Sequence, residues 1–334
     1  MTGPVVLHGS GLALKDDKDV AIRAEIRGVL TGFGLIAGVI VALTQVDLGL
    51  PGQVILQSLQ LHIAASLVGL AIFLALAGAR WRAGFIAALA VFAGGHVMWR
   101  VADQYEGRSA LQDSERLAEF RVLSFNVLES NDRHAEIADF IAGSGADIVV
   151  IMEAARMRQH LPKLETVYPY RAGCVSAATC DLMMLSKLAL SDTELRSLGT
   201  TYPNRMIVAR TEIAEEPVTL VAAHLTKPYF DGAGLHEVWR LTEHLSEIDG
   251  PLVLAGDFNS APWSDAIDML IQRADLLPPP RYNATWPTEF GPLGVPIDHI
   301  FSRAPIVIED IEALADPMGS NHLGLFARLQ LVAQ

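Results

Sequence analysis

The chain has 334 residues, of which 51% are hydrophobic and 19% are charged, and its formal net charge at pH 7 is −13. This apolar content excludes an intrinsically disordered chain, and two cysteines are too few for a disulfide-rich scaffold. After residue 100 there are 18 Lys and Arg against 33 Asp and Glu, a net charge of −15. This part of the chain therefore lacks the basic footprint that a binder of duplex nucleic acid normally shows.

Three long apolar runs precede residue 101, at 29–46, 54–79 and 83–99. A helix needs roughly 20 apolar residues to cross a bilayer core, so we expect an N-terminal membrane region over 1–100 with three transmembrane helices. A cleaved signal peptide is not expected, because the first run starts far from residue 1 and two more follow it. The third run is the shortest and contains Gly94, Gly95 and His96, so a helix lying on the membrane surface is the alternative there.

The flanking charges predict an orientation. Basic residues precede the first run and separate the second from the third: Lys15, Lys18, Arg23, Arg27, Arg80 and Arg82. The loop around Asp47 has none. Because basic segments stay in the cytoplasm, three inserted helices would place everything after Arg100 outside the inner membrane, in the periplasm. With only two inserted helices, the rest of the chain would lie in the cytoplasm.

Residues 101–119 are mixed and charged, and we expect them to form a linker. Cys174 and Cys180 lie beyond it, six residues apart. Such a pair closes a short loop in an oxidising compartment and otherwise remains two buried thiols. The expected location outside the membrane favours the disulfide.

From residue 120 onward, short apolar runs alternate with helical patterns, without a tandem repeat. Strands are expected at 121–126, 147–153, 182–186, 206–212, 218–224, 252–256, 297–301, 306–314 and 323–331. Helices are expected at 134–144, 234–248 and 264–274, the last one capped by Ser264. This alternation predicts one α/β domain over 120–334.

Polar side chains stand at the ends of these expected strands. They are Asn126, Glu153, His224, Asp257, Asn259, Asp298 and His322. Side chains alternate along a strand, so Asp257 and Asn259 are expected on one side with Phe258 turned away. A carboxylate beside an amide suits a hydrated phosphate, because the carboxylate takes a proton or a metal while the amide donates to a phosphoryl oxygen. Taken singly, each residue is equally consistent with a turn, a cap or a core position.

In their order and their residues, these segments resemble the endonuclease/exonuclease/phosphatase superfamily. This superfamily includes pancreatic deoxyribonuclease, abasic-site endonucleases, inositol polyphosphate 5-phosphatases and neutral sphingomyelinases. The resemblance covers about residues 120–331 and depends on the combination of Gly-Asp-Phe-Asn at 256–259, Asp-His at 298–299 and Ser-Asn-His at 320–322. It implies a four-layered α/β sandwich, with two β-sheets packed face to face between helices. It also implies an active site where strand ends of both sheets converge.

The resemblance further implies how the site residues act. A phosphodiester is anionic, so an enzyme must neutralise charge, position a water and stabilise the leaving oxygen. Mg²⁺ (or Mn²⁺) suits this task, because it takes few protein carboxylates and keeps several waters. Glu153 is the expected metal ligand, and Asn126 beside it is expected as a further metal ligand and substrate contact. His322, paired with Asp298, is implied to contact the scissile phosphate or to act as the general base.

Asp257 is implied to orient or deprotonate the attacking water, and the sequence does not decide between Asp257 and His322 as the base. His224 and Asn259 match positions that contact phosphate. Arg205, which follows Tyr-Pro-Asn and precedes a strand, is a candidate substrate contact, since arginine grips phosphate with two hydrogen bonds. A solvated turn residue is the alternative for Arg205.

Three further residues lie next to these positions. Lys227 and Tyr229 follow the strand that ends at His224, and both are candidates for the mouth of the site. His299 follows Asp298 directly and therefore points to the opposite face of its strand, where we expect a structural role.

Asn321 departs from the family pattern, which usually reads Ser-Asp-His where this chain reads Ser-Asn-His. An amide oxygen still coordinates Mg²⁺ but carries no charge, so Asn321 is expected to be a weaker metal ligand. The same departure is consistent with a non-catalytic homologue that binds a ligand or partner.

The sequence thus predicts a membrane-anchored, divalent-metal-dependent phosphohydrolase that cleaves phosphodiesters. The expected partners are a phosphoester substrate (a lipid head group, a small phosphodiester or nucleic acid) and the lipid bilayer, and no protein partner is inferred. A nuclease acting on extracytoplasmic nucleic acid and a non-catalytic binding homologue are the alternatives.

Overall fold

The computed structural model describes residues 10–46, 48–50, 52–109, 111, 114–176, 180–228 and 232–333. The chain forms two compact units, each described by itself. The first comprises Met1–Leu48 and Leu59–Met98, and the second comprises Gly49–Ser58 and Trp99–Gln334. The short segment between the first two apolar helices therefore belongs to the large second unit.

The first unit is helical. It contains α1 (Ser10–Gln45), α3 (Gln60–Leu76) and most of α4 (Arg80–Gln104). Its small buried core includes Val41, Leu67, Leu74 and Ile86, whereas many other large apolar side chains are exposed. By length and composition, two helices in the described part of the chain can cross a membrane, Val20–Gln45 and Arg80–Arg108, and the apolar helix Gln60–Leu76 is shorter.

The second expected membrane helix, 54–79, is divided in the structure. A short helix, α2 (Gln53–Ser58), ends before α3 begins, and its Gln57 and Ser58 are buried within the second unit. The physical reason is polarity, since buried amide and hydroxyl groups need hydrogen-bond partners that lipid does not supply.

The expected linker, 101–119, also differs from the structure. The helix α4 continues to Gln104, α5 covers Glu106–Ser109, and the first strand begins at Arg116. Leu111 packs against the cluster that contains Leu277, and Gly107 lies next to the same leucine. This stretch is therefore folded onto the sheets of the second unit.

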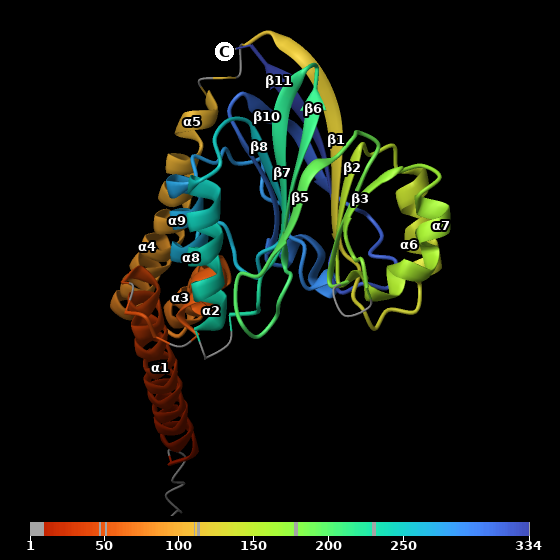
Figure 1. The fold of residues 1–334 in the computed structure, drawn as a ribbon. Helices are drawn as coiled ribbons and strands as arrows, with labels where there is room; N and C mark the ends of the chain where they lie inside the picture. The colour runs from red at the N-terminus through yellow and green to blue at the C-terminus, as the bar shows by residue number, and fades with distance from the viewer. Residues whose placement is uncertain are drawn as a thin grey trace, which may run out of the picture. The chain divides into compact units, whose positions relative to one another are not determined.

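Two mixed β-sheets form the centre of the second unit (Figure 1). Within the described residues, the first is six-stranded, in the order β10-β11-β1-β2-β4-β3. Its strands are β10 (Ile306–Ala313), β11 (Leu325–Val332), β1 (Arg116–Asn126), β2 (Ile148–Met152), β4 (Leu182–Ser186) and β3 (Tyr170–Gly173). The second sheet is five-stranded over the same described range, in the order β5-β6-β7-β8-β9. Its strands are β5 (Ser191–Arg196), β6 (Met206–Ile213), β7 (Glu216–His224), β8 (Leu252–Asp257) and β9 (Asp298–Arg303).

The two sheets pack face to face, and helices cover their outer faces (Figure 1). The outer face of the six-stranded sheet is covered by α6 (His134–Gly143), α7 (Leu161–Leu164) and the 3₁₀ helix Ala154–His160. The outer face of the five-stranded sheet is covered by α8 (Ala233–Ser246) and α9 (Asp265–Arg273). A further 3₁₀ helix spans Thr288–Leu293. The expected four-layered α/β sandwich is therefore confirmed.

Alternation along the strands assigns each side chain to a layer. On β8, Val253 and Ala255 face the other sheet, whereas Leu252 and Leu254 face α8 and α9. Both faces of the central strands are covered, which explains why these strands read as continuous apolar runs. The strands β3 and β5 were not expected from the sequence, because their residues are largely polar and partly exposed: Ser191–Arg196 contains no fully buried side chain.

Cys174 and Cys180 form a disulfide in the structure, as the sequence analysis favoured. The bond closes the segment that joins β3 to β4 and ends immediately before Asp181. It thereby links the end of one strand to the start of its neighbour.

Candidate active site

The strand ends that carry polar side chains lie together at one edge of the sandwich. Register pairs His224 of β7 with Asp257 of β8, and Asp257 with Asp298 of β9, so these three residues lie side by side. Their positions continue the rows that face the opposite sheet, because Ala222, Ala255 and Ile300 belong to the core between the sheets. The candidate site is therefore the polar end of the core between the two sheets.

Gly256 allows β7 and β8 to approach closely at this point. A Cβ atom on Gly256 would lie 1.8 Å from the carbonyl oxygen of Ala223, and its φ of 155° is one that other residues rarely adopt. The residue before Asp257 must therefore be glycine if His224 and Asp257 are to remain neighbours.

Asp257 is the centre of the site. It is fully buried, and its Oδ2 accepts a hydrogen bond of 3.0 Å from Nδ2 of Asn126. The same oxygen lies 3.8 Å from Nε2 of His224 and 3.9 Å from Nε2 of His322. Burial and the nearby Asp298 carboxylate raise the pKa of Asp257, although both histidines and Asn126 oppose the rise.

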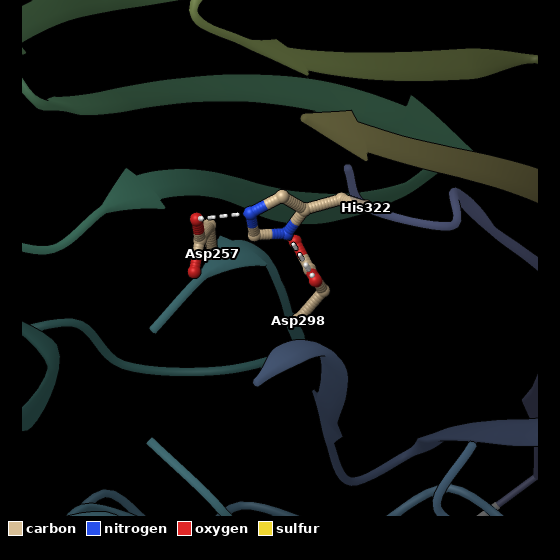
Figure 2. A group of neighbouring side chains, drawn as sticks. All are labelled: Asp257, Asp298 and His322. Carbon is tan, nitrogen blue, oxygen red and sulfur yellow. Dashed lines mark hydrogen bonds and ion pairs between the residues drawn. The ribbon is translucent and has the colours of Figure 1, made fainter. Parts of the chain in front are cut away.

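His322 lies between two carboxylates (Figure 2). Its Nδ1 is 2.8 Å from Oδ2 of Asp298, and its Nε2 is directed toward Asp257. Burial disfavours the imidazolium, but the charges of Asp298 and Asp257 outweigh burial and raise the pKa of His322 to about 9. The hydroxyl of Ser320 fixes this segment, because it donates to the carbonyl of Asn126 and accepts from the amide of His322.

His224 forms a second imidazole–carboxylate pair, with Asp181. Its Nδ1 is 2.6 Å from Oδ2 of Asp181, whose Oδ1 accepts a hydrogen bond of 3.1 Å from Arg205. Burial alone would raise the pKa of Asp181, but the hydrogen bond and charge of His224, with those of Arg205, lower it. Two histidines, each held through Nδ1 by a carboxylate, thus direct Nε2 at the same oxygen of Asp257.

Asp181 was missed in the sequence analysis. It precedes β4 rather than ending a strand, and the chain around it, Cys-Asp-Leu, resembles an ordinary turn entering a strand. The single available signal was its position directly after Cys180, at the end of the segment closed by the disulfide.

Glu153 follows β2 in the left-handed region, with φ of 55°. For a residue other than glycine this conformation is strained, and such strain is often found at functional sites. Oε1 of Glu153 accepts from Nδ2 of Asn126 at 3.3 Å, and Oε2 accepts from the amide of Glu129 at 2.9 Å. Asn126 therefore links Glu153 to Asp257.

The side-chain amide of Asn126 has a defined orientation in the structure. Its oxygen accepts a hydrogen bond from the amide of Leu128, and its NH₂ group faces Glu153 and Asp257. The physical reason is complementarity, because two carboxylates attract the donor end of the amide. In this orientation the NH₂ group of Asn126 holds the two carboxylates, and its expected role as a metal ligand stays a prediction.

Asn259 also adopts a left-handed conformation, with φ of 51°. Its backbone amide donates to Oδ1 of Asp257, and its side-chain amide donates to the carbonyl of Leu225. One NH₂ hydrogen is thus used to join the loops after β7 and β8, which leaves the other for the cavity that Asn259 lines.

A polar cavity of about 240 Å³ opens beside these residues. Glu129 and Glu153 line it, as do Arg205 and Lys227. Acidic and basic side chains therefore share one cavity, as a site for a metal-bound anion requires. Tyr229, the other residue expected at the mouth, lies outside the described residues.

The donor atoms fit a hard divalent cation. Glu153 supplies a carboxylate on the wall of the cavity, and the side-chain oxygen of Asn321 is buried without a hydrogen-bond partner among the described residues. One oxygen of Asp298 is likewise buried and unpartnered within that part of the chain. Asp257, Asp298 and His322 also place ligand atoms within 4.8 Å of one another. Oxygen donors of this kind suit Mg²⁺ or Mn²⁺.

The sequence of residues 123–322 matches the model of the Endonuclease/Exonuclease/phosphatase family. The chain belongs to this family. Its members are phosphoester hydrolases that depend on divalent metal, and this chain is an enzyme of that class. No curated protein matches the chain significantly in sequence.

Solved structures support the same fold. An endonuclease/exonuclease/phosphatase from Bacteroides vulgatus is 18% identical, with a TM-score of 0.53 over 64% of this chain and 100% of its own. An endonuclease/exonuclease/phosphatase from Beutenbergia cavernae DSM 12333 is 17% identical, with a TM-score of 0.53 over 65% of this chain and 72% of its own. Humanized D. rerio TDP2 is 18% identical, with a TM-score of 0.52 over 63% of this chain and 98% of its own.

Proposed function

We propose that the protein hydrolyses phosphodiesters, with Asp257 acting on the attacking water. The observation that carries this proposal is the convergence of Asn126, His224 and His322 on one oxygen of Asp257. A buried carboxylate with a raised pKa is a stronger base than a solvated one, and Asn126 holds it in a single orientation. Asp257 is therefore the proton acceptor in this proposal.

His322 acts as a cation in the proposed reaction. Between two carboxylates it stays protonated at neutral pH, so it donates from Nε2 to a phosphoryl oxygen rather than accepting a proton from water. His224 has the same geometry on the other side of Asp257, and its Nε2 is placed to contact a phosphoryl oxygen. The phosphate is bound by two basic residues that line the cavity, Arg205 and Lys227. Arg205 is held by its ion pair with Asp181 and stacks on Tyr202.

Glu153 and Asn321 are the proposed ligands of a magnesium or manganese ion. When bound, the cation neutralises phosphate charge and stabilises the leaving oxygen. A mutant form of beta toxin from Staphylococcus aureus is a structural relative that has bound magnesium ions (15% identity, TM-score 0.50, 63% of this chain and 99% of its own).

The proposed location is the inner membrane, with the catalytic unit in the periplasm. The apolar helices and the basic residues beside them support this location. A nuclease is the second candidate, because D. rerio TDP2 is complexed with single-strand DNA product in a related structure (18% identity, TM-score 0.50, 63% of this chain and 98% of its own). The net charge of the part after residue 100 favours a smaller or lipid-borne phosphodiester.

The test is hydrolysis of bis(p-nitrophenyl) phosphate by the full-length protein in detergent, with Mg²⁺, Mn²⁺ or a chelator. Asp257→Asn and His322→Ala are each expected to lower kcat by about 10²–10⁴-fold, as removal of a catalytic acid or base normally does. A variant with no expected effect, Asn283→Ala, is the control. Equal inactivity of wild type and His322→Ala on phosphodiesters, nucleic acids and lipid vesicles would instead support a non-catalytic homologue.

A further inference from the structure

The loop that joins β8 to α9 begins inside the candidate site. It carries Asn259 and then runs through Ala261 and Trp263 to the first turn of α9. Nearly all of this loop is buried, and the side chain of Asn259 depends on its course. What holds the loop therefore also holds part of the site.

The α2 segment supplies hydrogen bonds to this loop across more than 200 positions of sequence. The hydroxyl of Ser58 accepts from the amide of Ala261 at 3.0 Å, in a buried position. The backbone carbonyl of Gln57 accepts from the indole of Trp263, also at 3.0 Å and also buried. A buried amide that lost such a partner would remain unsatisfied, at a cost larger than the bond is worth.

Gln57 also caps α9. Ser264 occupies the N-cap position, but it makes no side-chain cap and its hydroxyl donates backward to Ala261 instead. Oε1 of Gln57 accepts from the amide of Asp265, the first residue of the helix, and Nε2 of Gln57 donates to the carboxylate of Asp265. A residue from outside the helix thus satisfies one of the N–H groups in the first turn that have no partner within the helix.

The last residues of α4, which belong to the second unit, bond to the same loop. Nε2 of Gln104 donates to the carbonyl of Pro262 at 2.9 Å, and Arg100 donates to the carbonyl of Trp263 and pairs with Asp265 at 2.5 Å. The loop is therefore clamped by two pieces of chain, each of which adjoins an apolar helix.

We propose that Gln57 and Ser58 are positioning residues of the active site. They hold the loop that carries Asn259, so the segment between the first two apolar helices contributes to the catalytic unit. The expected effect on catalysis rests on the proposed function, whereas the stabilisation of the β8–α9 loop by Gln57 and Ser58 does not.

A consequence for membrane topology follows. Ser58 and Gln104 both bond to the loop between β8 and α9, so the proposal places them on one side of any membrane. The chain between them then crosses either twice or not at all. Under this proposal α3 and α4 insert together or not at all.

The experiment uses the full-length protein in lipid nanodiscs. Gln57→Ala, Ser58→Ala and the double variant remove the side-chain contacts, and Ser58→Thr retains the hydroxyl. Val54→Ala, in the same short helix, removes a methyl pair but no hydrogen bond and serves as the matched control. Amide hydrogen exchange of the peptide covering 258–266 and the kcat and KM for bis(p-nitrophenyl) phosphate are measured for each.

The double variant is expected to exchange about 10-fold faster in the 258–266 peptide, with peptides from β1 and β2 unchanged. We expect its kcat to fall about 10-fold while Ser58→Thr and Val54→Ala stay near wild type. Unchanged exchange in 258–266, or equal acceleration in β1 and β2, would overturn the proposal. If the wild type itself shows no hydrolysis, faster exchange in the double variant would preserve the hold on the loop and count against the proposed function alone.

Discussion

Burial disfavours the charged form of His322 and of His299 alike, and the charges that each imidazole faces decide in which direction its pKa moves. His322 faces two carboxylates, which raise its pKa to about 9 despite burial. His299 is equally buried on the outer face of β9, among Phe258, Phe301 and Tyr282, and burial lowers its pKa to about 4. This packing agrees with the structural role expected for His299, whose Nε2 bonds to the carbonyl of Ser260.

Because His299 is buried in its neutral form, we expect the free energy of unfolding to fall in acid. Its pKa falls from about 6.5 in the unfolded chain to about 4 in the folded one, so its stabilising contribution is complete above pH 6.5 and is lost as the pH falls through 4. The difference corresponds to roughly 3 kcal/mol. Thermal unfolding in detergent should therefore show a drop in Tm between pH 7 and pH 5 that is smaller in His299→Phe, which packs similarly and does not titrate. Identical drops in the two proteins would contradict the assignment.

We expect the substitution Asn321→Asp, which restores a negative charge, to increase the affinity for the metal ion. Asn321→Asp would add a carboxylate where an amide oxygen is now buried without a partner among the described residues. Because ligand charge governs affinity for Mg²⁺, the apparent Kd should fall about 10-fold in isothermal titration. Asn283→Asp adds the same charge elsewhere and should leave the Kd unchanged. An equal Kd in wild type and Asn321→Asp would remove Asn321 from the proposed ligands.

At the scale of elements, the sequence predicted the strands of the core and which of their ends carry polar side chains. It succeeded because a strand with both faces covered must be apolar, and a polar residue at its end then stands out, as Asp257 does after 252–256. It could not predict Asp181 or the cap that Gln57 provides to α9, since both are contacts between segments far apart in the chain. The amide orientation of Asn126 was likewise beyond prediction, because it depends on two carboxylates that only folding brings together.

The pair β7–β8 predicts an outcome for Gly256→Ala. The new methyl group would overlap the carbonyl of Ala223, so the strands must separate or shift and the neighbouring His224 and Asp257 must part. We expect destabilisation of about 3 kcal/mol or more, with activity lost. Gly143→Ala, at the end of α6 where a methyl group meets nothing within 4 Å, is the matched control for thermal unfolding. A wild-type Tm for Gly256→Ala would show that the strands can move apart freely.

At the scale of the whole molecule, the two units share one polypeptide that passes between them three times. The chain enters the second unit at Gly49, leaves it after Ser58 and returns at Trp99. The two units are therefore not separable at a single point in the sequence, in contrast to the single boundary expected near residue 100.

Cysteine labelling in native membranes tests the proposed topology. Leu50→Cys and Glu115→Cys are expected to react with an impermeant maleimide from the same side of the membrane, because both residues belong to the second unit. Ala79→Cys, between α3 and α4, is expected to react from the opposite side only if both helices cross. The disulfide between Cys174 and Cys180 keeps the native background low. Labelling of Leu50→Cys and Glu115→Cys from opposite sides would contradict the topology.

The clamp on the β8–α9 loop sets an order for biosynthesis. Ser58 and Gln57 leave the ribosome some 200 residues before the loop they bind, as the separations of 203 and 208 positions show. Closing so long a segment is slow compared with forming a local hairpin. The β8–α9 loop can then reach its final position only after the much earlier α2 segment has been brought to it, so the last part of the sandwich to be completed depends on one of the first parts to be synthesised.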